Sequence, residues 1–333
     1  MKVSQYLNQE NIKYSPKFNQ NEIVNRITQS ILPISIIIPT YQREQVLIDT
    51  LTYLLELPTK AAEIIVVDQT QQHQPETISQ LKELEIQEKI CWIKLSHPSI
   101  PYAMNEGILT AKYEIVLFLD DDIIPEADLV LSHWQAHQEY ENIIVAGRVI
   151  QPWEENQNLA VIKSPFATTE DGWRPNFMGG NFSVHTQQII ALGGLDENFV
   201  KVAYQFEAEF AYRFLKSGAR IRFEPLACIH HLKVSAGGTR SHGHHLTTCE
   251  PNHTVGDYYY LLCAKEMHGR LYKILTRPIR SITNRHHLFK PWWIPFTLIA
   301  EFRGLLWALT LFTKGPSYID QHIKFTPLNI DSA

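Results

Sequence analysis

Short apolar runs alternate with amphipathic segments along the first part of the chain. The apolar runs are rich in β-branched residues, which predicts buried strands at ISIIIP (34–39), EIIVVD (63–68), ICWIKL (90–95) and EIVLFL (114–119). Between them, the apolar and polar pattern predicts helices over 43–57, 75–89 and 101–112. Strands that alternate with helices predict an α/β fold with a doubly wound, mostly parallel, Rossmann-like sheet.

The pattern loosens after Pro125. We predict helices over 126–140 and 206–218, and strands over 142–150, 177–185 and 220–231. A loop rich in Gly, His, Ser and Thr follows at 232–253, before an aromatic-rich helical stretch. The predicted organisation is an N-terminal arm (1–32), a main domain (33–253) with halves 33–125 and 126–253, and a helical C-terminal extension (254–333).

Charge is distributed unevenly along the chain. The net charge is −5, but the segment from Lys265 to the C-terminus is basic. This asymmetry predicts an anionic neighbour for the C-terminal segment, either a membrane surface or an acidic partner, and we expect no nucleic-acid partner. The apolar stretch 291–312 is interrupted by Glu301 and Arg303, so we expect no membrane-spanning helix there. It predicts peripheral membrane contact by an in-plane helix, or a helix that packs on the main domain or on a second copy.

The cysteines indicate a reducing compartment. Cys91, Cys228, Cys249 and Cys263 form no CxxC pair, and the N-terminal residues lack the apolar segment of a signal peptide. We therefore predict a cytoplasmic protein. The basic C-terminal segment would favour a location at the inner face of the membrane.

Candidate chemistry follows the predicted strands. Ligands of open α/β sheets bind outside the carboxyl ends of the strands. The first strand delivers Pro39, Thr40, Tyr41 and Arg43 to that edge, the second delivers Asp68, and the fourth delivers Asp120, Asp121 and Asp122. Carboxylates of this kind bind a divalent cation together with substrate phosphates. Asp120 and Asp122 would project to one side of an extended segment, with Asp121 turned away. The alternative is a solvated acidic turn before a helix.

Several segments occur in a specific order. They are ISIIIPTYQR, EIIVVDQT, AMNEGILTAKYEIVLFLDDDIIP, GGNFSVHTQQIIALGGLDENF and FEAEFAYRFLKSG. In this order the chain resembles the family 2 glycosyltransferases, inverting enzymes with the GT-A fold, over about residues 33–231. The resemblance implies that Tyr41 lines the nucleotide base and that Asp68 contacts the base or ribose. It also implies that Asp120 and Asp122 form the DxD motif, which holds Mg²⁺ or Mn²⁺ against the donor diphosphate beside Asp121.

The resemblance also assigns the second half of the site. The family often shows EDxELxxR where this chain reads FEAEFAYR, so Glu207 is the candidate general base and Glu209 a structural residue. A helix places these two side chains about 200° apart. His230 is the candidate histidine of the metal shell. Gly180 and Asn181 of the GGN block, with Trp173 of the preceding segment, are assigned to the acceptor side.

This chain departs from the family pattern at three donor-side positions. Gln42, Gln69 and Met104 replace an Asn, an Asp and an Arg, whereas Asn105 keeps the family residue next to the lost arginine. We expect Asn105 to stay on the donor side.

The loop 232–253 either binds a metal through its histidines or closes over the donor, with Gly237 and Gly238 as hinges. We favour closure, because the histidine spacings match no standard zinc site.

The predicted function is inverting, metal-dependent transfer of a hexose-type sugar from a nucleotide-diphosphate sugar to an acceptor hydroxyl, in polysaccharide, glycan or glycolipid synthesis. The acceptor would be a glycan or a lipid-linked molecule. One alternative is a non-catalytic protein that binds sugar nucleotides or acts as a scaffold. Another is a nucleotidyltransferase, which the absence of glycine in PTYQR disfavours.

Overall fold

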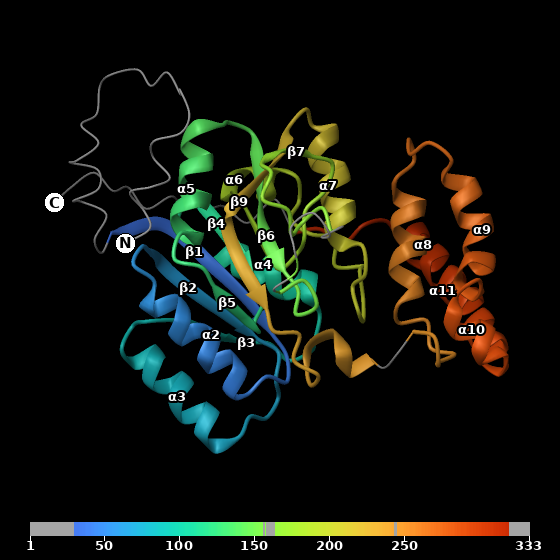
Figure 1. Cartoon of the computed structure of the whole chain (residues 1–333), viewed down its shortest axis with the longest axis horizontal. Helices are drawn as coiled ribbons and strands as arrows, with labels where there is room; N and C mark the ends of the chain where they lie inside the picture. The colour runs from blue at the N-terminus through green and yellow to red at the C-terminus, as the bar shows by residue number, and fades with distance from the viewer. Residues whose placement is uncertain (1–29, 156, 158–163, 243–244, 320–333) are drawn as a thin grey trace.

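The computed structural model of the chain describes residues 30–155, 157, 164–242 and 245–319 (Figure 1). Almost all of the predicted N-terminal arm therefore lies outside the described residues. The same holds for residues 320–333 of the C-terminal extension and for part of the stretch before Trp173.

A single mixed sheet forms the centre of the molecule. Its strands run in the order β3-β2-β1-β4-β8-β6-β9-β5, with β7 paired to β9. Strands β3, β2, β1 and β4 are all parallel, which is the doubly wound unit predicted from the sequence. Strand β8 runs antiparallel to both β4 and β6, and β9 runs parallel to β6. The strands are β1 (Ile31–Thr40), β2 (Lys60–Asp68), β3 (Cys91–Lys94), β4 (Ile115–Leu119), β5 (Ile123–Pro125), β6 (Ile143–Ile150), β7 (Gly172–Arg174), β8 (Asn181–His185) and β9 (Arg220–His231).

Helices cover both faces of the sheet, because the strands are apolar on both sides. In β1, Ile36 and Ile38 pack with α2 and α3, whereas Ile37 between them packs with α4. Strand β4 is buried along its whole length, so it fixes the position of the aspartates that follow it. The helices of the main domain are α2 (Gln45–Glu56), α3 (Pro75–Ile86), α4 (Ile100–Thr110), α5 (Leu129–Glu139), α6 (Thr186–Ala191) and α7 (Phe206–Lys216).

A helical C-terminal extension lies beside the main domain, as predicted (Figure 1). Helix α11 packs along α8, where Thr254 donates a hydrogen bond to the Ala300 carbonyl and leaves no room for a side chain at Gly304. The elements of this region are the 3₁₀ turn η2 (Gly238–His242), α8 (Thr254–Cys263), α9 (Arg270–Ile282), α10 (Arg285–Phe289), the 3₁₀ turn η3 (Pro291–Trp293) and α11 (Ile294–Lys314).

A partly buried charge cluster joins α8, α9 and α11. Arg277 pairs with Asp257, at 2.5 Å, and with Glu301, which also accepts a hydrogen bond from Tyr258. Glu301 therefore points inward, and the charge that interrupts the apolar run in the sequence is neutralised inside the extension. By length and composition, the helical segment Pro291–Lys314 would be able to span a membrane, which the interrupted apolar run did not predict.

Candidate active site

A cleft of about 300 Å³ opens at the carboxyl ends of β1 and β4. One wall is the turn after β1, and the floor is the acidic turn after β4. Gly179 and Gly180 before β8, the connector residues 201–204 and the first turn of α7 also line the cleft. The cleft therefore lies at the sheet edge where ligands of open α/β folds bind.

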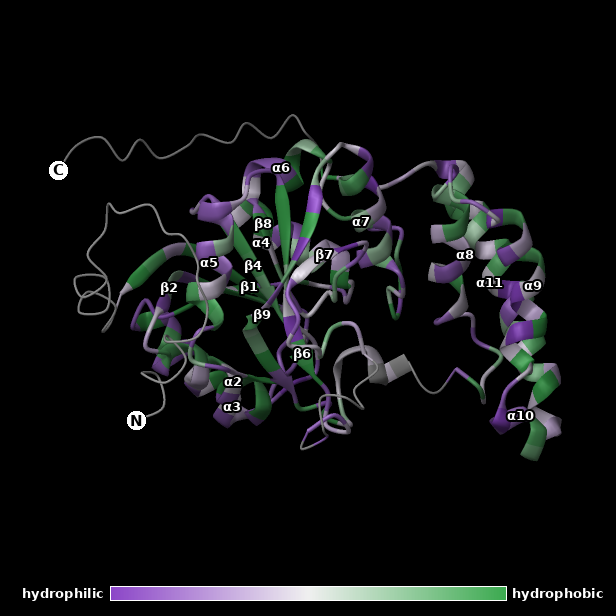
Figure 2. Ribbon diagram, turned by 45° about the horizontal axis from the view of Figure 1, so that its top comes forward, coloured by the Kyte–Doolittle hydropathy of each residue, from purple (hydrophilic) through white to green (hydrophobic). Residues whose placement is uncertain are grey.

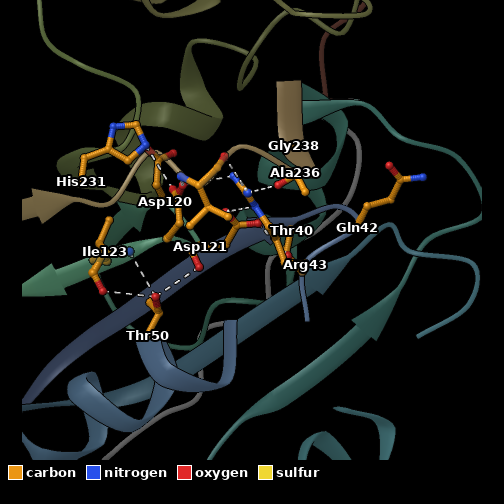
Figure 3. Close-up of polar contacts among 12 residues, drawn as sticks. Thr40, Gln42, Arg43, Thr50, Asp120, Asp121, Ile123, His231, Ala236 and Gly238 are labelled. Carbon is orange, nitrogen blue, oxygen red and sulfur yellow. Dashed lines mark hydrogen bonds and ion pairs between the residues drawn. The ribbon is translucent and has the colours of Figure 1, made fainter. Parts of the chain in front are cut away.

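The central aspartate of the triplet serves to hold the turn together. Thr40 donates a hydrogen bond of 2.7 Å to Asp121, and the Arg43 guanidinium lies 3.1 Å from the same carboxylate (Figure 3). Burial raises the pKa of Asp121 to about 6, although the charge of Arg43 acts in the opposite direction. Arg43 also donates to the backbone carbonyl of Ala236. This buried arginine, predicted to bind the donor, lines the cleft and also neutralises the acidic turn from within the chain.

The outer aspartates meet at one histidine. His231 Nε2 lies 3.1 Å from Asp122 Oδ1 and 3.9 Å from Asp120 Oδ2 (Figure 3). Burial alone would raise the pKa of Asp122, but its hydrogen bond with His231 and the charges of His231 and Arg43 lower it. One ligand atom from each of Asp120, Asp122 and His231 lies within 4.8 Å of the others. Carboxylate and imidazole ligands in this arrangement fit a divalent cation such as Mn²⁺.

The structure places His231, and not the predicted His230, beside the aspartate triplet. His230 points away from the triplet, toward Glu126 at 3.3 Å and Glu155 at 3.6 Å. Adjacent residues of β9 face opposite sides, so only His231 reaches the aspartates. The sequence shows two adjacent histidines, His230 and His231, at this position. Which of them faces the triplet depends on the register of β9, which the sequence does not reveal.

Only some of the residues predicted for the donor side line the cleft. Pro39, Thr40 and Tyr41 line the cleft as expected. Asp68 does not line it, because its fully buried carboxylate accepts a hydrogen bond from Trp92 and contacts His73 Nε2 at 2.8 Å. Asp68 is therefore placed as a core residue that anchors the end of β2.

Asn105 is also placed away from the cleft. Its side-chain amide donates to the Leu195 carbonyl and to Glu197, and its carbonyl accepts from the Leu195 amide. The residue thus fixes the connector after α6. The cleft wall instead contains Gln69, which accepts a hydrogen bond from the Ser99 amide and which the sequence analysis had treated only as a departure from the family pattern.

The three residues assigned to the acceptor side have different positions. Gly180 lines the cleft, but Asn181 is fully buried and donates to the carbonyls of Arg148 and Ala227. Trp173 sits on β7, which pairs with the beginning of β9, whereas the cleft lies at the end of β9. There it contacts the guanidinium of Arg220. Asn181 and Trp173 are therefore not brought to the cleft.

Glu207 faces the acidic turn from the other wall. It lines the cleft in the first turn of α7, and burial together with the charges of Asp120 and Asp257 raises its pKa to about 7. Glu209 lies on another side of the helix, where Arg213 holds it through contacts of 2.6 and 2.9 Å. The two carboxylates are thus separated as the helical spacing predicts, and only Glu207 faces the cleft.

The backbone before Glu207 is strained. Lys201, Ala203 and Gln205 all have positive φ values, of 64°, 53° and 74°, which non-glycine residues rarely adopt. Strain of this kind is concentrated at functional sites. Lys201 also lines the cleft as an exposed cation, a feature that no sequence motif had indicated.

A sequence model described as glycosyl transferase family 2 matches residues 35–190. The chain is therefore similar to family 2 glycosyltransferases over residues 35–190, which is a little less than half of its length. It is 29% identical over 115 residues to the uncharacterized glycosyltransferase YfnE of Bacillus subtilis (strain 168), which covers 34% of this chain and 29% of that protein. The family 2 region contains the aspartate triplet and Gly180, whereas Glu207 and His231 lie beyond the matched residues.

Solved structures show that the fold is GT-A. A crystal structure of GalNAc-T7 with UDP, GalNAc and Mn²⁺ superposes with a TM-score of 0.56 at 12% identity, over 82% of this chain and 54% of that one. A mannosyltransferase, PcManGT of Pyrobaculum calidifontis, with GDP-Man and Mn²⁺, gives 0.50 at 17% identity, over 85% and 79%. S. aureus TarS gives 0.50 at 14% identity, over 73% and 40%. This chain thus spans about half of the GalNAc-T7 chain.

Replacing Gly180 by alanine in this protein is expected to weaken Mn²⁺ binding about 10- to 100-fold while the fold is kept. The new Cβ would lie 2.0 Å from Asp120 Oδ2, and the half-exposed Asp120 side chain can swing aside. Calorimetric titration with Mn²⁺ measures the effect. In the control Gly147→Ala, the Cβ would meet Asn181 at 2.2 Å and the Ala227 carbonyl at 2.6 Å, so stability should fall instead. Unchanged Mn²⁺ affinity in Gly180→Ala would exclude Asp120 as a ligand.

Proposed function

We propose that this chain transfers a hexose-type sugar from a nucleotide-diphosphate sugar to an acceptor hydroxyl, with inversion at the anomeric carbon. The observation that carries the proposal is the pair of facing groups in the cleft. On one wall lies Glu207, a carboxyl group with a pKa near 7, and across from it lies the cluster of Asp120, Asp122 and His231. An acceptor hydroxyl needs a base such as Glu207, and a donor diphosphate needs a cation such as this cluster could hold.

Asp120, Asp122 and His231 are the residues that would hold Mg²⁺ or Mn²⁺. Their ligand atoms are close enough to share one ion, and Gly180 keeps the space beside Asp120 free of a side chain. When bound, the cation offsets negative charge on the leaving diphosphate. Lys201 adds a positive charge to the lining of the cleft. Met104, which replaces the arginine typical of the family, lines the same cleft.

Glu207 acts as the general base. It takes the proton of the acceptor hydroxyl as that oxygen bonds to the anomeric carbon, and the bond from this carbon to the diphosphate breaks. The nucleoside diphosphate leaves with the bonding electrons. Because the displacement occurs in one step on the face opposite the leaving group, the configuration is inverted. A pKa near 7 suits a base that works at neutral pH.

The donor nucleotide lies against the turn after β1 in this proposal. Tyr41 lines the cleft there, and its carbonyl accepts a hydrogen bond from the Gly238 amide of the loop after β9. Gly237 approaches the same turn so closely that a Cβ would lie 2.3 Å from the Gln42 carbonyl. The loop therefore closes one side of the donor cleft.

The acceptor is a glycan or a lipid-linked molecule used in polysaccharide, glycan or glycolipid synthesis of the cell envelope. Support for a location at the inner face of the membrane comes from 291–312, where Trp292, Phe296 and Phe302 are exposed. Large apolar side chains exposed on a helix beside basic residues favour peripheral contact with a lipid surface.

A screen of nucleotide sugars by thermal unfolding, with and without Mn²⁺, tests the proposal. We expect one nucleotide sugar to raise the melting temperature only when Mn²⁺ is present, because a ligand at 100 times its Kd adds about 2.7 kcal/mol to the free energy of unfolding. Release of the nucleoside diphosphate from that donor is then measured. Binding without release, with and without candidate acceptors, would instead identify a non-catalytic sugar-nucleotide-binding protein.

A further inference from the structure

Helix α9 is amphipathic, and its apolar side is exposed. Leu271, Leu275 and Ile279 lie on one side of the helix and are 66%, 76% and 64% exposed. Lys273 and Arg280 lie on the opposite side, where both are exposed and line a cavity of the extension. No residue of α9 is buried. A helix of a soluble domain normally turns its apolar side inward, so this arrangement favours an apolar neighbour that lies beyond the described residues.

Helix α11 repeats this arrangement. Its buried residues are Thr297, Ala300, Glu301, Gly304, Ala308 and Leu311, of which only Leu311 is large and apolar. Its outward side carries exposed large apolar side chains, among them Leu298, Ile299, Phe302, Leu306 and Leu309. Figure 2 shows the apolar segments of α9 and α11 at the same end of the molecule.

A cavity of about 740 Å³ lies between the polar sides of these helices. Lys273, Arg280, Ser281 and Asn284 contribute polar groups to its wall. Arg277 is neutralised by its two carboxylates, whereas no ion pair to Lys273 or Arg280 occurs within the described part of the chain. The cavity therefore offers unneutralised cations directly behind an exposed apolar surface.

The cavity borders the catalytic cleft. Tyr204 lines both spaces, and Gln205 lines the cavity only two residues before Glu207. Asp257, from the cavity wall, is one of the charges that raise the pKa of Glu207. A molecule whose charged group occupied the cavity would thus have its neighbouring atoms at the general base.

We infer that this cavity binds the phosphate group of a lipid-linked acceptor, whose hydrocarbon chain lies along the exposed apolar sides of α9 and α11 at an anionic membrane surface. The inference rests on the proposed glycosyl transfer and names the class of its acceptor. Lys273 and Arg280 supply the charge for the phosphate, and the apolar sides match a lipid chain.

Binding of farnesyl phosphate, followed by tryptophan fluorescence in phosphate-free buffer with EDTA, tests the inference. Chelation keeps the metal cluster of the cleft from competing for the phosphate. We expect wild type to bind farnesyl phosphate more tightly than farnesol or inorganic phosphate. The variant K273E/R280E should bind farnesyl phosphate about tenfold or more weakly, because two charge-assisted contacts are lost. The control K82E/K89E makes the same charge change at exposed positions on α3 and near its end, and should bind like wild type.

The outcomes separate this inference from the proposed function. Equal binding of farnesyl phosphate and farnesol, or equal affinity of wild type and K273E/R280E, would overturn the lipid phosphate site. So would a dimer that L275E converts to monomer without any change in farnesyl phosphate binding, since the apolar surface would then belong to a second copy. Donor hydrolysis with Mn²⁺, measured on the same proteins, should be unchanged in K273E/R280E. Its absence from wild type with every nucleotide sugar would instead contradict the proposed transferase.

Discussion

Replacing Asp122 by asparagine is expected to lower the rate of sugar transfer by a factor on the order of 10³. Asp122 is one of the ligands proposed for the cation, whose charge stabilisation in the transition state is worth several kcal/mol, at about tenfold in rate for each 1.36 kcal/mol. Asparagine keeps the size of the side chain and can still accept the hydrogen bond from the Val234 amide. The fold should therefore be kept, and release of nucleoside diphosphate measures the loss.

Asp128→Asn is the matched control for this change. Asp128 lies in the same acidic segment, is exposed, and makes no capping hydrogen bond at the start of α5. It should transfer sugar at the wild-type rate. If Asp122→Asn kept its activity and its Mn²⁺ affinity, the triplet would be a solvated acidic turn without a metal.

Replacing Glu207 by glutamine is expected to lower transfer by a factor of about 10² to 10⁴, the contribution of a positioned general base. The amide cannot take the proton of the acceptor hydroxyl. Binding of nucleotide and Mn²⁺ should persist, because the metal cluster lies on the other wall of the cleft. Nucleotide binding by calorimetry and transfer by product release separate the two effects.

The pH dependence gives a second measure of the same residue. Because a base must be ionised, kcat/KM should rise with pH up to the Glu207 pKa of about 7 and level off above it, and this limb should vanish in the glutamine variant. The folded pKa is above the ordinary 4.5, so ionisation costs the native state stability as pH rises from 4.5 through 7. Glutamine resembles the neutral form, so the variant should be at least as stable as wild type at pH 8.

Glu209→Gln is the contrasting variant. Glu209 is buried against Arg213, which also donates to the carbonyls of Leu192 and Gly194. Breaking a buried pair leaves an uncompensated charge and costs about 3–5 kcal/mol, so this variant should lose stability in chemical denaturation. Full activity of Glu207→Gln, or a loss of stability in Glu207→Gln equal to that of Glu209→Gln, would exclude Glu207 as the base.

The sequence by itself determined the α/β framework. The alternation of apolar runs with amphipathic helices was sufficient, because each strand buried on both faces must be continuously apolar and each covering helix must have one apolar side. It also placed the aspartate triplet correctly at the end of β4, since polar residues directly after a strand that is buried from Ile115 to Leu119 must lie at the edge of the sheet. The helical spacing separated Glu207 from Glu209 for the same local reason.

Tertiary structure decided which polar side chains reach the cleft. Asp68, Asn105 and Asn181 belong to the same motifs as residues of the site. Each of these side chains instead makes hydrogen bonds inside the core. His231 rather than His230 faces the triplet because of the register of β9, which strand pairing fixes over many residues.

Tertiary structure also left many large apolar side chains of the C-terminal helices exposed, whereas Arg277, Asp257 and Glu301 pair with one another between the helices. Local periodicity shows that a helix has two different sides. Which side faces the protein is settled only by contacts between residues that are distant in the sequence.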